Sequence, residues 1–172
     1  MPDPDSVQPL KWRRFPTAIE QFNSGSLARA ASMLELASDM IAKGEVDASI
    51  ASTVRSGAHE SLDFNRLRSY AEKAEKRHLL NRALLFFEGL SPRAVMEMLR
   101  LEPRRDRRRV FPSLLEAQGD AARTAALERL DVAARDPESA AQWYFPCNLI
   151  CLLNRIPRAD DSTIHSEITL AA

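Results

Sequence analysis

The sequence is poor in glycine and in aromatic residues, and it carries no net charge. Its 172 residues include 5 glycines, aromatic side chains make up 6%, and 24 basic side chains balance 24 acidic ones. Apolar residues nevertheless account for 45%, which excludes a disordered or fibrous chain. Alanine, leucine, arginine and glutamate dominate, and all four have a high helix propensity. The composition therefore predicts a single all-α domain over residues 1–172.

Groups that carry out chemistry are also scarce. The three histidines are scattered, no Ser-His-Asp order is convincing, and no glycine-rich phosphate loop occurs. The pair His59-Glu60 stands alone, whereas a metal site needs further ligands at helical spacing. We therefore expect a protein that is not an enzyme and that holds neither a metal nor a cofactor.

Long hydrophobic runs are absent as well. No stretch reaches the roughly 18 consecutive apolar residues that would span a bilayer. The first residues, Met1 to Asp5, lack the basic and apolar segments of a secretion signal. These absences predict a cytoplasmic protein that makes no membrane contact.

The zero net charge conceals an uneven distribution. Residues 61–110 carry 13 basic and 7 acidic side chains, whereas the segments on either side are acidic overall. Such segregation steers an anionic partner toward the middle of the chain, unless neighbouring helices neutralise one another in the folded protein.

The second half of the sequence contains a pattern that returns three times. Each unit has a leucine pair, a helix breaker and then a second short apolar helix. The pairs are Leu84-Leu85, Leu114-Leu115 and Leu152-Leu153. Their spacing of 30 to 38 residues predicts stacked pairs of antiparallel helices, because one pair alone cannot bury its apolar face.

The first half predicts less regular structure. Residues 1–14 are expected to form an extended leader, since prolines stand at positions 2, 4 and 9, and residues 15–76 to form helical hairpins. Ser, Thr and Asp side chains cap helices by accepting hydrogen bonds from the free N–H groups of the first turn. The expected caps are Thr17, Ser26, Asp47, Asp63 and, farther along, Asp106.

The helix expected from Trp143 to Leu153 is apolar on nearly every side, which is typical of a helix enclosed by its neighbours. Its two cysteines, Cys147 and Cys151, are therefore expected to be buried core thiols. Asn148 is expected to bond a neighbouring turn, because a buried amide without partners is costly.

Two prolines lie inside predicted helices. Pro112 and Pro146 should each kink the helix or mark its late start, because proline lacks an N–H donor and crowds the preceding turn.

The run from Asp106 to Asp160 resembles HEAT repeats of the kind strung together in long bacterial proteins. The matching phrases are Asp106–Arg109, Leu114–Gly119, Ala125–Leu130, Trp143-Tyr144 and Asn148–Arg158. The resemblance implies a right-handed α-solenoid of antiparallel helix pairs over residues 77–172 that presents a concave surface to partners.

The sequence stops at Ala172, part-way through the third unit. We expect either an incomplete last repeat or a self-capping helix. An open repeat end exposes apolar surface, so residues 160–172 are the expected site of any homo-oligomer contact.

The densest charge in the sequence is an arginine cluster formed by Arg104, Arg105, Arg107, Arg108 and Arg109. Closely spaced guanidinium groups make bidentate contacts with anionic oxygens. Three interpretations stay open, namely a solvated or internally paired helix face, a site for an acidic protein, and a site for nucleic acid.

Tyr144 is a further candidate contact residue, because aromatic side chains are frequent at binding hot spots and its hydroxyl can stay exposed. The sequence thus predicts a protein-binding scaffold or regulatory module that uses the arginine cluster and Tyr144. The alternative is a nucleic-acid-binding helical repeat that uses the same arginines.

Overall fold

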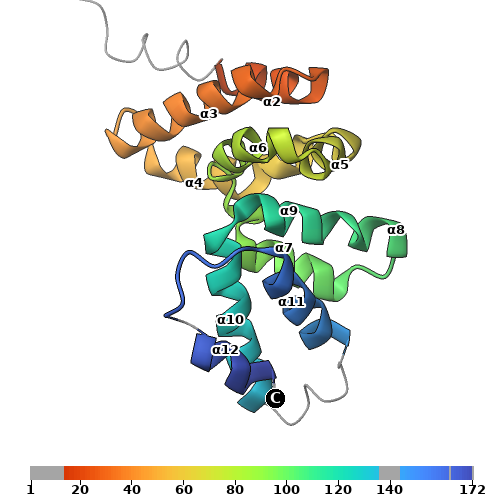
Figure 1. Cartoon of the computed structure of the whole chain (residues 1–172). Helices are drawn as coiled ribbons and strands as arrows, with labels where there is room; N and C mark the ends of the chain where they lie inside the picture. The colour runs from red at the N-terminus through yellow and green to blue at the C-terminus, as the bar shows by residue number, and fades with distance from the viewer. Residues whose placement is uncertain (1–13, 136–143, 163, 172) are drawn as a thin grey trace, which may run out of the picture. The chain divides into compact units, whose positions relative to one another are not determined.

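All regular secondary structure in the part that the structure describes is helical (Figure 1). The computed structural model describes residues 14–135, 144–162 and 164–171, and no strand occurs among them. The all-α prediction is therefore confirmed. The expected leader, apart from its last residue, lies outside the described residues, as does Trp143. The chain divides into two compact units, residues 1–91 and residues 92–172.

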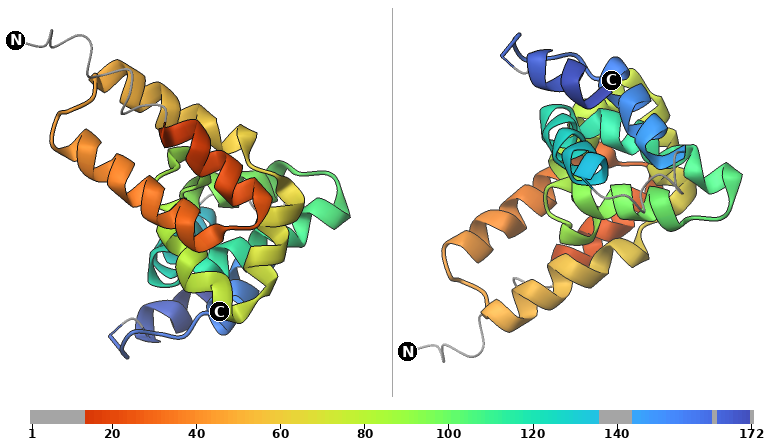
Figure 2. Two further views of the ribbon diagram at one scale, coloured as in Figure 1. Left: turned by 90° about the horizontal axis from the view of Figure 1, so that it is seen from above. Right: turned by 90° about the horizontal axis from the view of Figure 1, so that it is seen from below.

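The first unit is built from short helices. In chain order they are α2 (Arg14–Ser24), α3 (Leu27–Ala42), α4 (Ala48–Gly57), η2 (Ala58–Ser61), α5 (Phe64–Glu72), η3 (Ala74–Lys76), α6 (Arg77–Leu84) and η4 (Glu88–Leu90), where η marks a 3₁₀ helix. Helix α3 packs along α2 and against α6. Figures 1 and 2 show α2 and α3 side by side.

The core of the first unit centres on two aromatic side chains. Phe22 and Tyr70 are almost fully buried, and their rings meet edge to face with 5.1 Å between centroids. The Tyr70 hydroxyl donates a hydrogen bond of 2.9 Å to the Phe22 carbonyl oxygen. Tyr70 thus buries a large ring without leaving its hydroxyl unsatisfied.

Two of the predicted helix caps in this unit are confirmed. The Asp47 carboxylate accepts hydrogen bonds from the backbone N–H groups of Ser49 and Ile50, and the Asp63 carboxylate accepts one from Arg66. Ser26 stands at the N-terminus of α3, but its side chain makes no capping bond. Thr17 does not stand at a capping position, because α2 already begins at Arg14.

The second unit is arranged around its longest helix. Its elements are α7 (Pro92–Leu101), α8 (Arg105–Arg108), α9 (Val110–Gln118), α10 (Asp120–Arg135), α11 (Tyr144–Arg155) and α12 (Ile164–Ala171). Helix α10 contacts α7, α9, α11 and α12. The turn before α10 contains Gly119 at φ +57°, a left-handed conformation that favours glycine.

Both prolines mark a helix start. Pro112 is the third residue of α9, and Pro146 is the third residue of α11. The N–H groups of a first helical turn have no intrahelical partner, so proline costs nothing there. Asp106, however, does not cap a helix, because α8 begins at Arg105 with Arg104 at the capping position.

The prediction that α11 is enclosed on all sides is wrong. Phe145, Leu149 and Leu152 are buried, but Cys147 and Cys151 on the opposite side are exposed. At 100° per residue the buried positions fall on one stripe and the two cysteines on the other side. Asn148 is likewise exposed, so it needs no partner inside the protein.

Helix length also bears on membrane insertion. Among the described residues, no helix combines the length and the apolar character that crossing a membrane requires.

Candidate functional site

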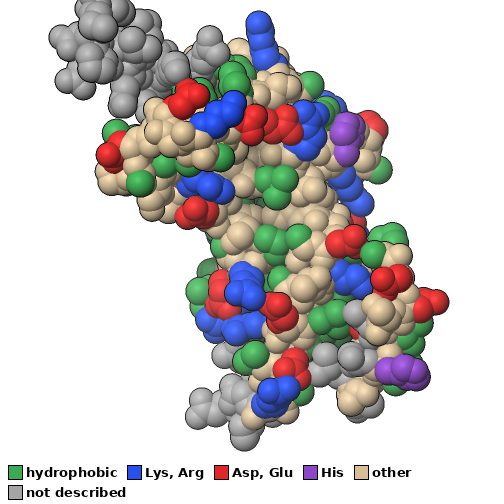
Figure 3. Space-filling model, turned by 90° about the vertical axis from the view of Figure 1, so that its left-hand side faces the viewer, with side chains coloured by type: hydrophobic (Ala, Val, Ile, Leu, Met, Phe, Trp, Pro, Cys, Tyr) green, Lys and Arg blue, Asp and Glu red, His purple; other side chains and the backbone are tan. Residues whose placement is uncertain are grey.

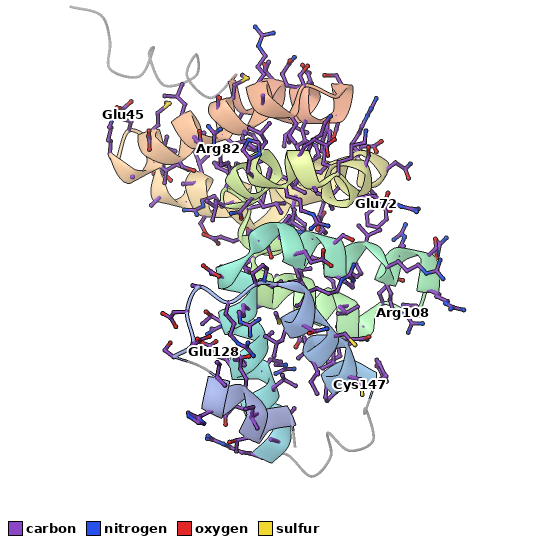
Figure 4. The ribbon with its side chains drawn as sticks, in the orientation of Figure 1. Glu45, Glu72, Arg82, Arg108, Glu128 and Cys147 are labelled. Atoms are coloured by element: carbon purple, nitrogen blue, oxygen red, sulfur yellow. The ribbon has the colours of Figure 1, made fainter. Side chains whose placement is uncertain are left out.

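The arginine cluster lies on the surface of the second unit. Arg105, Arg107 and Arg108 belong to α8, Arg104 precedes this helix and Arg109 follows it. Four of the five side chains are exposed and that of Arg108 is half-buried. Figure 4 labels Arg108 on α8, at the edge of the ribbon. The local sequence thus presents five guanidinium groups over six positions, with Asp106 the one acidic residue among them.

Three of the five guanidinium groups in the cluster have no partner among the described residues. Arg104 pairs with Asp106 at 3.4 Å, and both side chains are more than 60% exposed. Within the described part of the chain, the guanidinium groups of Arg105, Arg108 and Arg109 form neither an ion pair nor a hydrogen bond. An exposed pair at this distance contributes little free energy, so the charges of Arg104, Arg105 and Arg109 face solvent.

Several other arginines are paired. Arg82 forms two hydrogen bonds with the Glu35 carboxylate, at 2.5 and 2.6 Å. Through these bonds the Arg82 guanidinium lowers the pKa of Glu35, although desolvation of the carboxyl acts in the opposite direction and raises it. In the second unit, Glu97 accepts bonds from Arg100 and Arg129. Figure 3 shows basic and acidic side chains next to one another on the face that it draws. These paired arginines contrast with Arg105, Arg108 and Arg109, which have no partner among the described residues.

Tyr144 lies close in space to the chain just before the cluster. Its hydroxyl donates a hydrogen bond of 3.3 Å to the carbonyl oxygen of Arg100, and its side chain is 37% exposed. The next residue after Arg100 is Leu101, which is 65% exposed. The structure therefore brings Tyr144 to the end of α7, four residues ahead of Arg104.

We call the arginine cluster together with Leu101 and Tyr144 the basic surface. It combines fixed positive charge with one exposed aliphatic and one exposed aromatic side chain. Arginine and tyrosine are enriched in protein interfaces, where they give both contact area and directional bonds. The sequence patterns did not point to Leu101, because its exposure depends on where α7 ends.

No group of three or more His, Cys, Asp or Glu side chains that could hold a metal ion occurs within the residues that the structure describes. His59, in η2, packs against Gly89: a Cβ atom at Gly89 would stand 2.2 Å from the imidazole Cε1. His59 is thus part of the packing of the first unit, whereas Glu60 is exposed.

A second polar feature lies between α10, α11 and α12. Arg123 donates hydrogen bonds to the carbonyl oxygens of Leu153 and Ile156 and to the Glu167 carboxylate, which Arg158 also contacts. These groups line a cavity of about 320 Å³. The buried Arg123 and Glu167 already pair with each other, and Arg123 also bonds the C-terminal end of α11. These bonds link α12 to α10 and α11.

Comparisons of the chain with protein-family models, with curated proteins and with solved structures gave no match.

Proposed function

We propose that this chain is a non-catalytic binding module whose basic surface takes an acidic segment of another protein. The observation that carries the proposal is the exposed arginine cluster, in which three guanidinium groups have no partner within the described residues. Carboxylates of a partner would accept charge-assisted, bidentate hydrogen bonds from those guanidinium groups.

The apolar neighbours favour a protein over a polyanion alone. Leu101 and Tyr144 expose apolar surface beside the charges, and an aliphatic side chain gains nothing from a phosphate backbone. Protein interfaces, in contrast, surround an apolar centre with polar and charged groups. The partner segment is therefore expected to combine Asp or Glu with at least one apolar side chain.

We also propose that the second unit is built from HEAT-like helix pairs. The support is that α9 and α10 follow one another through the turn at Gly119, and that α11 and α12 both pack on α10. Repeats of this type commonly serve as scaffolds, because stacked helix pairs present an extended surface.

Nucleic acid is the second candidate ligand, and the density of arginines is what favours it. Phosphate binding releases counterions, so its affinity falls steeply with salt concentration. A protein interface with apolar contacts depends less on salt. The two candidates therefore differ in an easily measured property.

The test is fluorescence anisotropy with two labelled probes of equal negative charge, a Glu- and Leu-containing peptide and a single-stranded oligonucleotide. We expect the peptide to bind the unmodified chain and to lose affinity in the variant Arg105→Glu/Arg108→Glu. The matched control is Arg29→Glu/Lys43→Glu, which makes the same charge change on exposed positions of the first unit. Tighter binding of the oligonucleotide, abolished by the α8 variant and by salt, would replace the protein partner with nucleic acid.

A further inference from the structure

The two cysteines of the chain lie together on the exposed side of α11. Cys147 and Cys151 are the only cysteines in the sequence, and both are exposed. Cysteine is among the residue types that proteins bury most often. Figure 4 labels Cys147 on α11. The buried stripe of α11, formed by Phe145, Leu149 and Leu152, lies on the other side of the helix, so packing on that stripe does not explain the two surface thiols.

Their spacing places the two thiols side by side. Residues four apart on an α-helix are neighbours on one face, with Cβ atoms about 5–6 Å apart. A disulfide requires a Cβ separation of about 3.8 Å, so a direct bond between these cysteines would distort the helix. A metal ion bridging the two sulfurs, with metal–sulfur bonds of about 2.3 Å each, spans up to about 4.6 Å between sulfurs. The helix geometry thus suits a bridging ion better than a disulfide.

The surroundings restrict which ion fits. No third His, Cys, Asp or Glu joins the two thiols in a metal-binding group within the described residues. Structural zinc takes four protein ligands, more than the described residues around the two thiols provide. Soft thiolate ligands select monovalent copper, an ion that is satisfied by two sulfurs.

We propose that Cys147 and Cys151 form a dithiolate site for one soft monovalent metal ion of the copper(I) class. On binding, each thiol releases its proton to solvent and each sulfur donates an electron pair to the ion. One copper(I) ion and two thiols thus give one anionic bis-thiolate complex and two protons, with no change in oxidation state. The site is independent of the partner-binding role proposed for the basic surface.

The test is an oxygen-free titration of the full chain with copper(I), buffered by the coloured chelator bicinchoninate. We expect one copper ion per chain. Cys147→Ser and Cys151→Ser should each lower the affinity by more than about 100-fold, since each removes one of two ligands and not merely an outer-shell partner. Both positions are exposed, so neither change should unfold the helix, which circular dichroism would verify.

Two double variants test the spacing itself, and both place the new thiol at an exposed asparagine of α11. Cys147→Ser/Asn154→Cys sets two thiols three residues apart on one face and should restore one copper per chain. Cys151→Ser/Asn148→Cys sets them at adjacent positions, which do not face each other, and should not. The proposal would be overturned if the single variants bound copper as tightly as the unmodified chain, or if the two double variants bound it equally. A stoichiometry of one copper per two chains would also overturn it.

Discussion

Arg123 of α10 and Glu167 of α12 form an ion pair in which both side chains are buried, 7% and 8% exposed. The two residues are 44 positions apart in the sequence. The same guanidinium also bonds the carbonyl oxygens of Leu153 and Ile156 at the end of α11. One arginine therefore joins three helices of the second unit.

Replacing Glu167 with Gln is expected to destabilise the second unit strongly. Removing one partner of a buried pair leaves the other charge uncompensated, at a cost of about 3–5 kcal/mol. Urea unfolding followed by circular dichroism measures this change. Arg158→Gln is the control, because this more exposed partner leaves the buried pair intact and should cost much less. Equal stability of Glu167→Gln and the unmodified chain would show that the pair does not hold α12.

The contact between His59 and Gly89 predicts a coupled pair of substitutions. Gly89→Ala would place its Cβ within 2.3 Å of two imidazole atoms, so we expect a loss of about 1–3 kcal/mol from overpacking. In the His59→Ala background the same change should cost far less. A double-mutant cycle of urea unfolding gives the coupling free energy. Additive effects would mean that the ring moves aside freely.

The hydrogen bond from Tyr70 to the Phe22 carbonyl predicts the effect of removing one oxygen atom. Tyr70→Phe keeps the ring but leaves the buried carbonyl without this donor, at a cost of about 1–2 kcal/mol. Thermal unfolding of the two proteins at neutral pH measures it. A variant as stable as the unmodified chain would assign the stability to ring packing alone.

Alkaline conditions provide a second test of Tyr70. Burial raises the pKa of this phenol above its ordinary value, so the folded state favours the neutral form. Its contribution is therefore complete below the unfolded pKa of about 10 and is lost as the pH rises through the folded pKa. We expect the stability difference between the unmodified chain and Tyr70→Phe to shrink above pH 10.

The helix starts show what could be predicted from the sequence. Asp47 and Asp63 cap helices as expected because capping depends on the side chain and the next three residues. Asp106 failed as a cap because Arg105 already lies in helical conformation. The sequence therefore predicts a helix cap well when no long-range contact intervenes and no neighbouring residue begins the helix earlier.

The sides of α11 show what could not be predicted. Cysteine counts as apolar, so Cys147 and Cys151 made the helix look apolar all round, whereas the stripe of Phe145, Leu149 and Leu152 alone decides its orientation. The pairing of Arg123 with Glu167 left no local signal either, because it depends on how α12 returns to α10. The arginine cluster was visible in the sequence, but the fold decides that Arg105, Arg108 and Arg109 are the members without a partner among the described residues.

Acid should weaken the link between α3 and α6. The bonds from Arg82 hold the pKa of Glu35 below its ordinary value, so this pair contributes above the unfolded pKa of about 4.3. The contribution is lost as the pH falls through the folded pKa. Both side chains are more than 40% exposed, so salt should reduce the effect. Unfolding curves of Glu35→Gln and the unmodified chain should converge at low pH.

The central claim is that the basic surface binds an acidic protein. The most direct measurement is quantitative capture from native extract by three baits: the unmodified chain, Arg105→Glu/Arg108→Glu, and the control Arg29→Glu/Lys43→Glu, all after nuclease treatment. The account predicts a protein with an acidic segment that the first and third baits retain and the second loses. Capture of the same proteins by all three baits, or loss of every partner after nuclease treatment, would contradict it.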